Sequence, residues 1–264
     1  MDGLEIVQSD HTVEVRLDRP AKANALSACV VEGLLDLLDE CERRRVRLLI
    51  FSGNGAHFCA GFDLGGLQAQ TDGDLLWRLI RIETLLQRIH HAPFLTMALA
   101  HGTVVGAGTD LVCVCAFRIA APGTSFRMPG WRFGVALGTR RLVARIGTSA
   151  ARSVLLEGRR FDAEEGLRIG FVDRIAPGET WREEIRKAQR AACALDSDAT
   201  ASLLRTSVAD TRSEDMASLV STAGRPGLKG RILAYQEAAR RRTGSAKPEV
   251  LGTADSKPAN FVKQ

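Results

Sequence analysis

Hydrophobic side chains follow two different spacings over the first 44 residues. Apolar and polar residues alternate over residues 4–8 and 12–20, which predicts two strands joined as a β-hairpin. Over residues 25–44 the apolar positions recur three and four apart. This spacing predicts an amphipathic helix, with Ser27 as its N-cap and a basic last turn.

Strand-like and helical segments alternate along the rest of the chain. Continuous apolar runs over residues 46–53 and 94–102 are typical of strands buried on both faces, and shorter strand-like runs follow at 117–123 and 125–130. Three later segments show helical spacing: residues 75–91, residues 138–158 with a break near Gly147, and residues 179–242. This alternation predicts an α/β fold, and we find no internal repeat.

Length and composition are those of an ordinary globular protein. The chain has 264 residues, of which 45% are hydrophobic and 25% charged. No apolar run approaches the roughly 20 residues that span a bilayer, and the first ten residues lack the features of a signal peptide. The six cysteines form no CxxC pair and no zinc-type spacing with histidine. We therefore expect a cytoplasmic protein with reduced cysteines, no metal and no membrane partner.

The charge balance is mildly basic. The formal net charge is +5 at pH 7, and much of the basic excess lies in residues 225–231 and 237–249. Such a balance suits a phosphate-bearing ligand or weak nucleic-acid contact. The sequence has no RNA-binding motif and no aromatic residues among the basic ones. We therefore expect a solvated helix end and tail in this region, and no nucleic-acid partner.

Two glycine-bearing turns, at residues 58–64 and 104–111, follow predicted strands. Backbone amides at such turns and at a helix N-terminus can bind an anion. Two amides that converge would stabilise an enolate formed from a thioester. On spacing alone, an ordinary turn is the simpler interpretation of each. Cys59 lies in the first turn, but no base stands beside it in the sequence, so we do not expect a nucleophile.

Five stretches together resemble the crotonase superfamily, the enoyl-CoA hydratase/isomerase family. They are "LDRPAKANAL", "FSGNGAHFCAGFDLGGL", "ALAHGTVVGAGTDLVCVCAFRIA", "FRMPGWRFGVALGTRRL" and "FDAEEGLRIGFVDRI". The resemblance implies an α/β fold with a crotonase-type ββα spiral core over residues 1–176 and a helical trimerisation region over 177–242. It also implies a homotrimer or homohexamer that binds acyl-CoA as its substrate. We expect a mobile tail over residues 243–264, where the periodicity is lost.

The resemblance also implies roles for individual residues. The amides of Phe62 and Ala107 would form the oxyanion hole, and Trp131 would line the acyl pocket. The positions that would contact CoA, largely through backbone groups, are Lys22, Ala23, Ala60, Asp63 and Leu64. No cofactor is implied beyond the acyl-CoA substrate.

The chain departs from the hydratases of this family at one of their two glutamates. The first glutamate maps to Asp110, a shorter carboxylate, and the second maps to Gly130 in "MPGW". The loop that follows is two residues shorter than in the family, so Gly138 and Thr139 match no family position. Syn hydration needs one group to activate water and another to deliver a proton. A single base still suffices for double-bond isomerisation, and it could assist decarboxylation or thioester hydrolysis.

Three other residues are weaker candidates. Glu83 lies on the helix that covers the pocket in this family and could replace the missing acid, although a solvent-facing position is our expectation. His57 precedes the first glycine turn, where a surface position is the simpler interpretation. His101 is expected to serve in packing or hydrogen bonding.

The sequence therefore predicts an enoyl-CoA hydratase/isomerase-family enzyme that works through an enolate, with Asp110 as its single acid/base. Gly130 supports an alternative, a non-catalytic acyl-CoA-binding or scaffold protein of the same fold. An RNA-binding role, as in some relatives, rests only on the basic excess.

Overall fold

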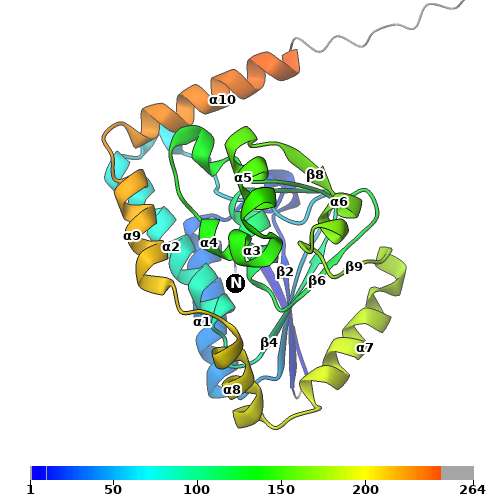
Figure 1. Ribbon diagram of the computed structural model, residues 1–264. Coiled ribbons are helices and arrows are strands. Elements are labelled where there is room, and N and C mark those ends of the chain that lie inside the picture. Colours follow the sequence, from blue (N-terminus) through cyan, green and yellow to red (C-terminus); the bar gives the residue numbers. More distant parts are fainter. Residues whose placement is uncertain (1, 10, 245–264) are drawn as a thin grey trace, which may run out of the picture.

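The structure is a computed structural model that describes residues 2–9 and 11–244 (Figure 1). From residue 245 onward, the tail predicted over 243–264 lies outside the described residues. No helix among the described residues is long and apolar enough to cross a membrane. All six cysteines are free thiols.

Six strands form the main sheet, in the order β1-β2-β3-β4-β6-β9. Their bounds are Leu4–Gln8 (β1), Thr12–Leu17 (β2), Leu48–Gly53 (β3), Leu95–Ala100 (β4), Phe117–Ala120 (β6) and Arg174–Ile175 (β9). The first two strands pair antiparallel, which confirms the predicted hairpin, and all the other neighbours are parallel. The parallel strands require crossovers, and the intervening helices supply them.

Strands β3 and β4 are buried on both faces, as their apolar runs predict. In β3, Leu49 and Phe51 belong to the main core, whereas Leu48 and Ile50 belong to a second core on the opposite face. This alternation follows from the two-residue period of a strand. Helices α1 and α2 cover the first face, and α7 covers the second (Figure 1).

Two helices precede β4, and eight more make up most of the described chain after it. Their bounds are Ala28–Arg43 (α1), Asp72–His90 (α2), Ala107–Val114 (α3), Thr139–Ile146 (α4), Thr148–Glu157 (α5), Ala163–Arg168 (α6), Trp181–Ala192 (α7), Ser197–Ser207 (α8), Arg212–Ala223 (α9) and Leu228–Gly244 (α10). The predicted cap is confirmed, because the Ser27 hydroxyl accepts a hydrogen bond from the Val30 amide at 3.3 Å. The predicted break at Gly147 separates α4 from α5.

A second, three-stranded sheet positions the glycine turns. It has the order β5-β7-β8, with bounds Thr103–Val105 (β5), Ser125–Arg127 (β7) and Arg160–Asp162 (β8). Phe126, Phe161 and Phe171 pack against one another at its base, with ring centroids 5.0–5.3 Å apart. A β-bridge between Cys59 and Val104 joins this sheet to the first glycine turn. The two turns are thereby held side by side.

Candidate active site

The two predicted oxyanion amides lie on adjacent segments. Phe62 forms a parallel bridge with Leu26, in which Leu26 bonds to Gly61 and Asp63, so the Phe62 amide points to the opposite side. Ala107 is the first residue of α3, where amides have no acceptor within the helix. Neither amide donates a hydrogen bond to another described residue.

Glycine allows this close approach. Gly61 has a φ of +79°, and a Cβ at this position would lie 2.9 Å from the Ala107 nitrogen and would also collide with the Val105 carbonyl. Any other residue would therefore push the two turns apart. Two unpaired amides at one point can bind an oxyanion.

Asp110 lies in the first turn of α3, and its own amide donates to the Gly106 carbonyl at 3.0 Å. Its carboxyl group is buried, and Oδ1 has no hydrogen-bond partner among the described residues. Burial raises the pKa of Asp110 well above its usual range; the charge of Arg141 opposes this shift, and that of Glu83 adds to it. The carboxyl group therefore holds its proton to higher pH than an exposed aspartate does.

Gly138 closes the far side of the Asp110 carboxyl group. It precedes α4 in a left-handed conformation, with φ 64° and ψ 6°. A Cβ at Gly138 would collide with Asp110 Oδ1, so the backbone itself forms the wall behind the acid. The sequence offered no family position for this glycine, and the structure shows that Asp110 packs directly against it.

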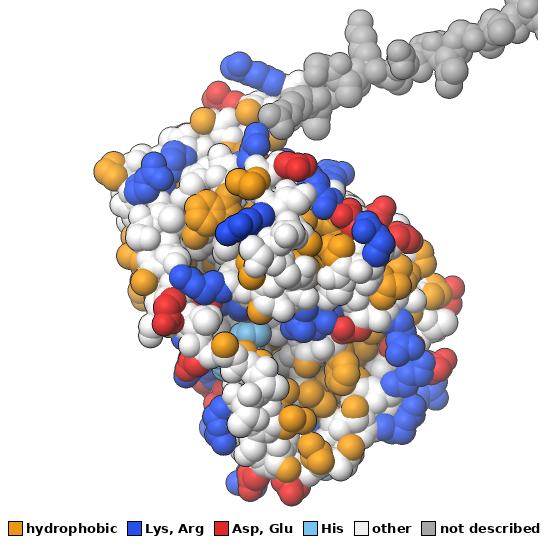
Figure 2. Space-filling view, in the orientation of Figure 1, with side chains coloured by type: hydrophobic (Ala, Val, Ile, Leu, Met, Phe, Trp, Pro, Cys, Tyr) orange, Lys and Arg blue, Asp and Glu red, His pale blue; other side chains and the backbone are white. Residues whose placement is uncertain are grey.

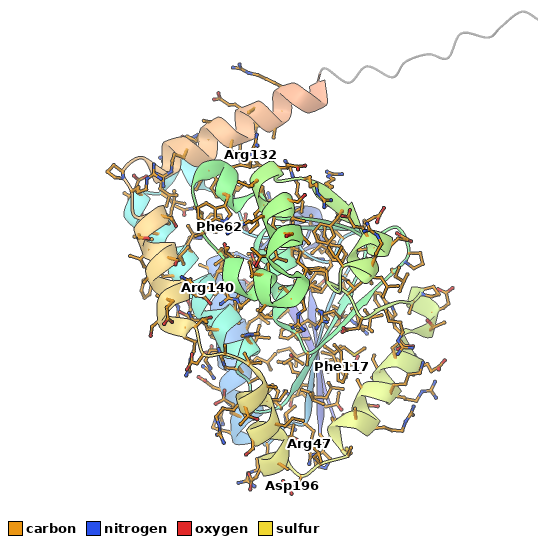
Figure 3. The ribbon with its side chains drawn as sticks, viewed as in Figure 1. Arg47, Phe62, Phe117, Arg132, Arg140 and Asp196 are labelled. Carbon is orange, nitrogen blue, oxygen red and sulfur yellow. The ribbon has the colours of Figure 1, made fainter. Side chains whose placement is uncertain are left out.

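A cavity of about 140 Å³ lies in front of the amides and the acid. Seven of the predicted site residues line it: Ala60, Phe62, Leu64, Ala107, Asp110, Gly130 and Trp131. Lys22, Ala23 and Asp63 are not among its lining residues. The remaining wall is apolar except for Tyr235. Figure 3 shows Phe62 within the body of the molecule and Arg132 nearer to α10.

The predicted CoA contacts outside the cavity shape the loops around it. The Ala23 carbonyl accepts a hydrogen bond from the Ala60 amide at 2.9 Å. Asp63 binds Arg19 at 2.8 Å and accepts from the Gly65 amide at 2.8 Å. Burial opposes the effect of these partners, but together they hold the pKa of Asp63 below its usual range. Lys22 is exposed at the end of a short 3-10 helix, so its ammonium group faces solvent.

Glu83 is buried rather than solvent-facing, so the expectation of a solvent-facing position is wrong, and its carboxylate is engaged in an ion pair outside the cavity lining. Its side chain is 1% exposed, and both of its oxygens accept hydrogen bonds from Arg141, at 2.8 and 2.6 Å. Arg141 also binds Asp215 on α9 at 3.2 Å. This buried network joins α2, α4 and α9 behind Asp110. Burial of Glu83 is possible because its charge is fully paired.

The weaker candidates do not join the cavity. His57 is partly buried, and its Nδ1 accepts from the Thr103 amide at 3.2 Å. His101 Nε2 lies 3.0 Å from the Gly55 carbonyl, in agreement with a hydrogen-bonding role. Burial raises the pKa of the Cys59 thiol to about 12, so this group stays protonated and is no nucleophile.

Trp131 lies at the mouth of the cavity and is 43% exposed. Its Nε1 donates to Thr139 Oγ1 at 3.0 Å, which fixes the indole as part of the wall. Three further residues line the cavity that the sequence did not predict: Ile232 and Tyr235 on α10, and Phe133. The one available signal was that Tyr235 is the single tyrosine of the chain.

The fold and the paired glycine turns define an enzyme class that comparison with known proteins identifies. The enoyl-CoA hydratase/isomerase family model matches residues 8–223. This chain therefore belongs to the enoyl-CoA hydratase/isomerase family, which confirms the predicted resemblance and the crotonase-type α/β fold.

Individual relatives agree with this assignment. A Mycobacterium bovis protein described as an enoyl-CoA hydratase is 31% identical, over 69% of this chain and 75% of its own length. A Bacillus subtilis protein with the same description is 34% identical, over 72% and 74%. A structure from Bordetella parapertussis described as an enoyl-CoA hydratase/isomerase superposes with a TM-score of 0.88 at 45% identity, covering 89% of this chain and 98% of its own.

Proposed function

We propose that this protein acts on an acyl-CoA thioester through an enolate, with Asp110 as its single acid/base and Gly130 in place of the second acid of the hydratases. The observation that carries this proposal is one buried carboxyl group with an unpaired oxygen in a cavity that also contains two unpaired amides. The thioester oxygen would accept hydrogen bonds from the amides of Phe62 and Ala107. Family membership and the names of the relatives support acyl-CoA as the substrate.

Double-bond isomerisation is the reaction that this arrangement supports best. The Asp110 carboxylate removes a proton from C2 of a 3-enoyl thioester, and the electron pair moves to the thioester oxygen as a dienolate. The same carboxyl group, now protonated, returns the proton to C4, and the double bond then lies between C2 and C3. The raised pKa suits the first step, because it makes the Asp110 carboxylate a stronger base toward the C2 proton.

Hydration is less well supported by the same cavity. A water molecule would need a second group to hold and activate it. Gly130 offers no side chain, and Glu83 is held by Arg141 outside the cavity lining. Tyr235 also lines the cavity, but its phenol hydroxyl is an O–H donor and weak acceptor and does not replace a carboxylate base.

The first experiment follows the conversion of a 3-enoyl-CoA into a 2-enoyl-CoA by absorbance, with crotonyl-CoA hydration measured in parallel. Isomerisation that is abolished by Asp110→Asn while CoA binding persists is the expected result. Turnover unchanged in Asp110→Asn would exclude the assignment of Asp110. Rapid hydration of crotonyl-CoA by the wild type would exclude a single-base site.

Gly130 also supports the second candidate, a protein that binds acyl-CoA without turning it over. If the protein turns over none of the thioesters tested but still binds them, this candidate is favoured. The exchange of α-hydrogen for deuterium in butyryl-CoA separates the two more sharply. It needs only a base and an oxyanion hole, so a silent but competent site would still show it.

We also propose a homo-oligomer, a trimer or hexamer as in the family. Hydrophobic side chains gather on the surface between α7 and α8 (Figure 2). Leu195 and Leu203 in this region are 44% and 54% exposed. Light scattering after gel filtration measures the mass; a monomer at micromolar concentration would contradict the proposal.

A further inference from the structure

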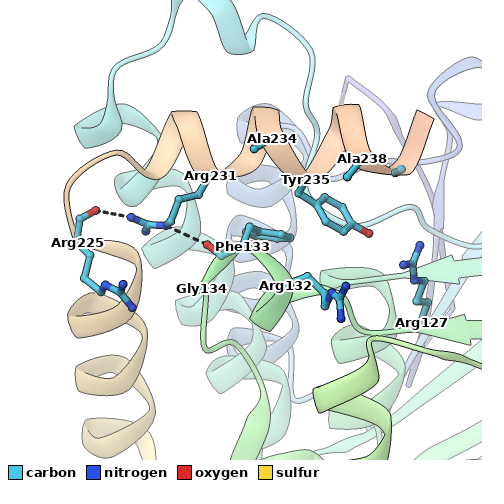
Figure 4. A pocket seen from close by; sticks show the side chains of 10 residues that line it. Arg127, Arg132, Phe133, Gly134, Arg225, Arg231, Ala234, Tyr235 and Ala238 are labelled. Atoms are coloured by element: carbon cyan, nitrogen blue, oxygen red, sulfur yellow. Dashed lines mark hydrogen bonds between the residues drawn. The ribbon is translucent and has the colours of Figure 1, made fainter. Parts of the chain in front are cut away.

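A second pocket lies beside the acyl cavity and is strongly basic. It has a volume of about 600 Å³ and lies between α10 and the 3-10 helix Gly130–Phe133 (Figure 4). Four arginines line it: Arg127, Arg132, Arg225 and Arg231. No acidic residue is among its described lining. Among the late basic residues, for which a solvated helix end is predicted, Arg225 is exposed, whereas Arg231 is partly buried and lines this pocket.

The arginines of this pocket form no ion pair with a described residue, whereas about half of the arginines outside it do. Arg231 is instead fixed by backbone carbonyls, including that of Phe133 at 3.0 Å. Arg127 Nε donates to the Gly158 carbonyl at 2.8 Å. The Arg132 guanidinium makes no hydrogen bond with a described residue, although its backbone amide donates to the Pro129 carbonyl at 2.8 Å. The pocket therefore carries a concentration of positive charge with no carboxylate in its described lining, although the charge of Arg231 also acts on Asp72 outside it.

Two rings separate this pocket from the acyl cavity. Phe133 and Tyr235 line both spaces, with ring centroids 5.3 Å apart. Figure 4 shows the Tyr235 hydroxyl and the guanidinium groups of Arg127 and Arg132 turned toward the same space. A ligand that extends past these rings would leave the apolar wall and meet three hydrogen-bond donors, namely the Tyr235 hydroxyl and the two guanidinium groups.

We propose that this pocket binds a carboxylate at the far end of the acyl chain, so that the preferred substrate is the CoA monothioester of a dicarboxylic acid. This inference rests on the proposed function, because it requires the thioester at Phe62 and Ala107. The apolar cavity holds the methylene groups of the chain. Arg132, Arg127 and the Tyr235 hydroxyl bind the terminal carboxylate.

The position of α10 argues against the CoA phosphates as the anion. Arg231, Ala234 and Ala238 face the basic pocket, whereas Leu233 and Gln236 on the same helix face the loop that carries Leu64. The predicted CoA contacts are on the Leu64 side, together with Lys22. The helix therefore lies between the arginines and the expected path of CoA.

The test measures binding of saturated thioesters by calorimetry, because these ligands are not consumed by isomerisation or hydration. Glutaryl-, adipyl- and suberyl-CoA are compared with pentanoyl-, hexanoyl- and octanoyl-CoA, and with free CoA. Wild type should bind at least one diacid about tenfold more tightly than its monoacid partner. Arg132→Gln should remove about fivefold or more of that preference without changing monoacid binding. Tyr235→Phe keeps the ring and should reduce the same preference.

Arg152→Gln on α5 is the matched control, because Arg152 is exposed and lines neither space. It should leave all affinities unchanged, and thermal melting checks that each variant folds. Equal affinity for diacids and monoacids at every length in wild type would overturn the proposal. So would a loss in Arg132→Gln that is the same for free CoA, since that result assigns the pocket to a phosphate. A preference for diacid thioesters without turnover would support the carboxylate site and contradict only the catalytic proposal.

Discussion

Replacing Gly138 by alanine should disable Asp110 while leaving the carboxyl group in the sequence. An alanine in the left-handed conformation costs about 1–2 kcal/mol relative to glycine. The added methyl group would also collide with Asp110 Oδ1, which packs against this backbone. Overpacking of a closed site costs a further amount of about 1–3 kcal/mol. The lowest-energy response is a rotation of the Asp110 side chain away from Gly138, which displaces the carboxyl group from its position relative to the amides of Phe62 and Ala107.

The expected result is a fall in kcat of about 100-fold, because a displacement of about 1 Å from a reactive geometry costs that much. KM should change less, since the oxyanion amides and the cavity wall remain. The assay is the isomerisation of a 3-enoyl-CoA, with deuterium exchange into butyryl-CoA as a second readout. Denaturant unfolding measures the accompanying loss of stability.

Gly66→Ala is the matched control for this experiment. Gly66 has nearly the same backbone conformation, with φ 68° and ψ 13°, and a Cβ there would come no closer than 3.7 Å to another side chain. The Gly66→Ala variant should lose the free energy of unfolding that an alanine costs in the left-handed conformation. Its kcat should stay unchanged. Equal kcat values in Gly138→Ala and Gly66→Ala would refute the argument that the Gly138 backbone positions the acid.

Three further predictions concern the acid and its surroundings. Arg141→Met should destabilise the fold by about 3–5 kcal/mol in denaturant unfolding, because it leaves Glu83 charged and unpaired in the interior; a loss below about 1 kcal/mol would contradict a tightly paired network. The unfolded Asp110 carboxyl group ionises near pH 4 but the folded one only at higher pH, so ionisation favours unfolding as the pH rises between the two pKa values. Asp110→Asn should therefore gain stability over wild type from about pH 4 upward, and a difference that is constant with pH would count against the raised pKa. Gly130→Glu should not create an efficient hydratase, because its Cβ would lie 2.9 Å from the Val135 carbonyl and displace that loop. Rapid hydration of crotonyl-CoA by this variant would contradict the prediction and show that the loop can accommodate the side chain.

Local pattern predicted the regular elements of the core well. The runs around Leu49 and Met97 predicted strands buried on both faces, since each strand feeds two cores. Ser27 and Gly147 marked a helix start and a helix break because caps and glycines act locally. The strands at 160–162 and 174–175 escaped notice, because segments of two or three residues are too short to show a period.

The site was less predictable wherever it depends on contacts between distant residues. Asp110 and the two amides followed from the resemblance to a family. The burial of Glu83 did not, because its partner Arg141 lies 58 residues further along the chain. The basic pocket brings together Arg127, Arg132 and Arg231 from three separate segments, and no periodicity links them.

The last two helices, α9 and α10, contribute to different parts of the site. Through Asp215, α9 is tied into the charged network behind Asp110, whereas α10 contributes Ile232 and Tyr235 to the wall that the acyl chain meets. The chain turns between these helices at Gly227, which has a φ of +80°. Changes in α10 can therefore retune which acyl groups are accepted without disturbing the support of the acid. A descendant of this protein could thus acquire a new substrate by a few substitutions in one helix while inheriting its chemistry intact.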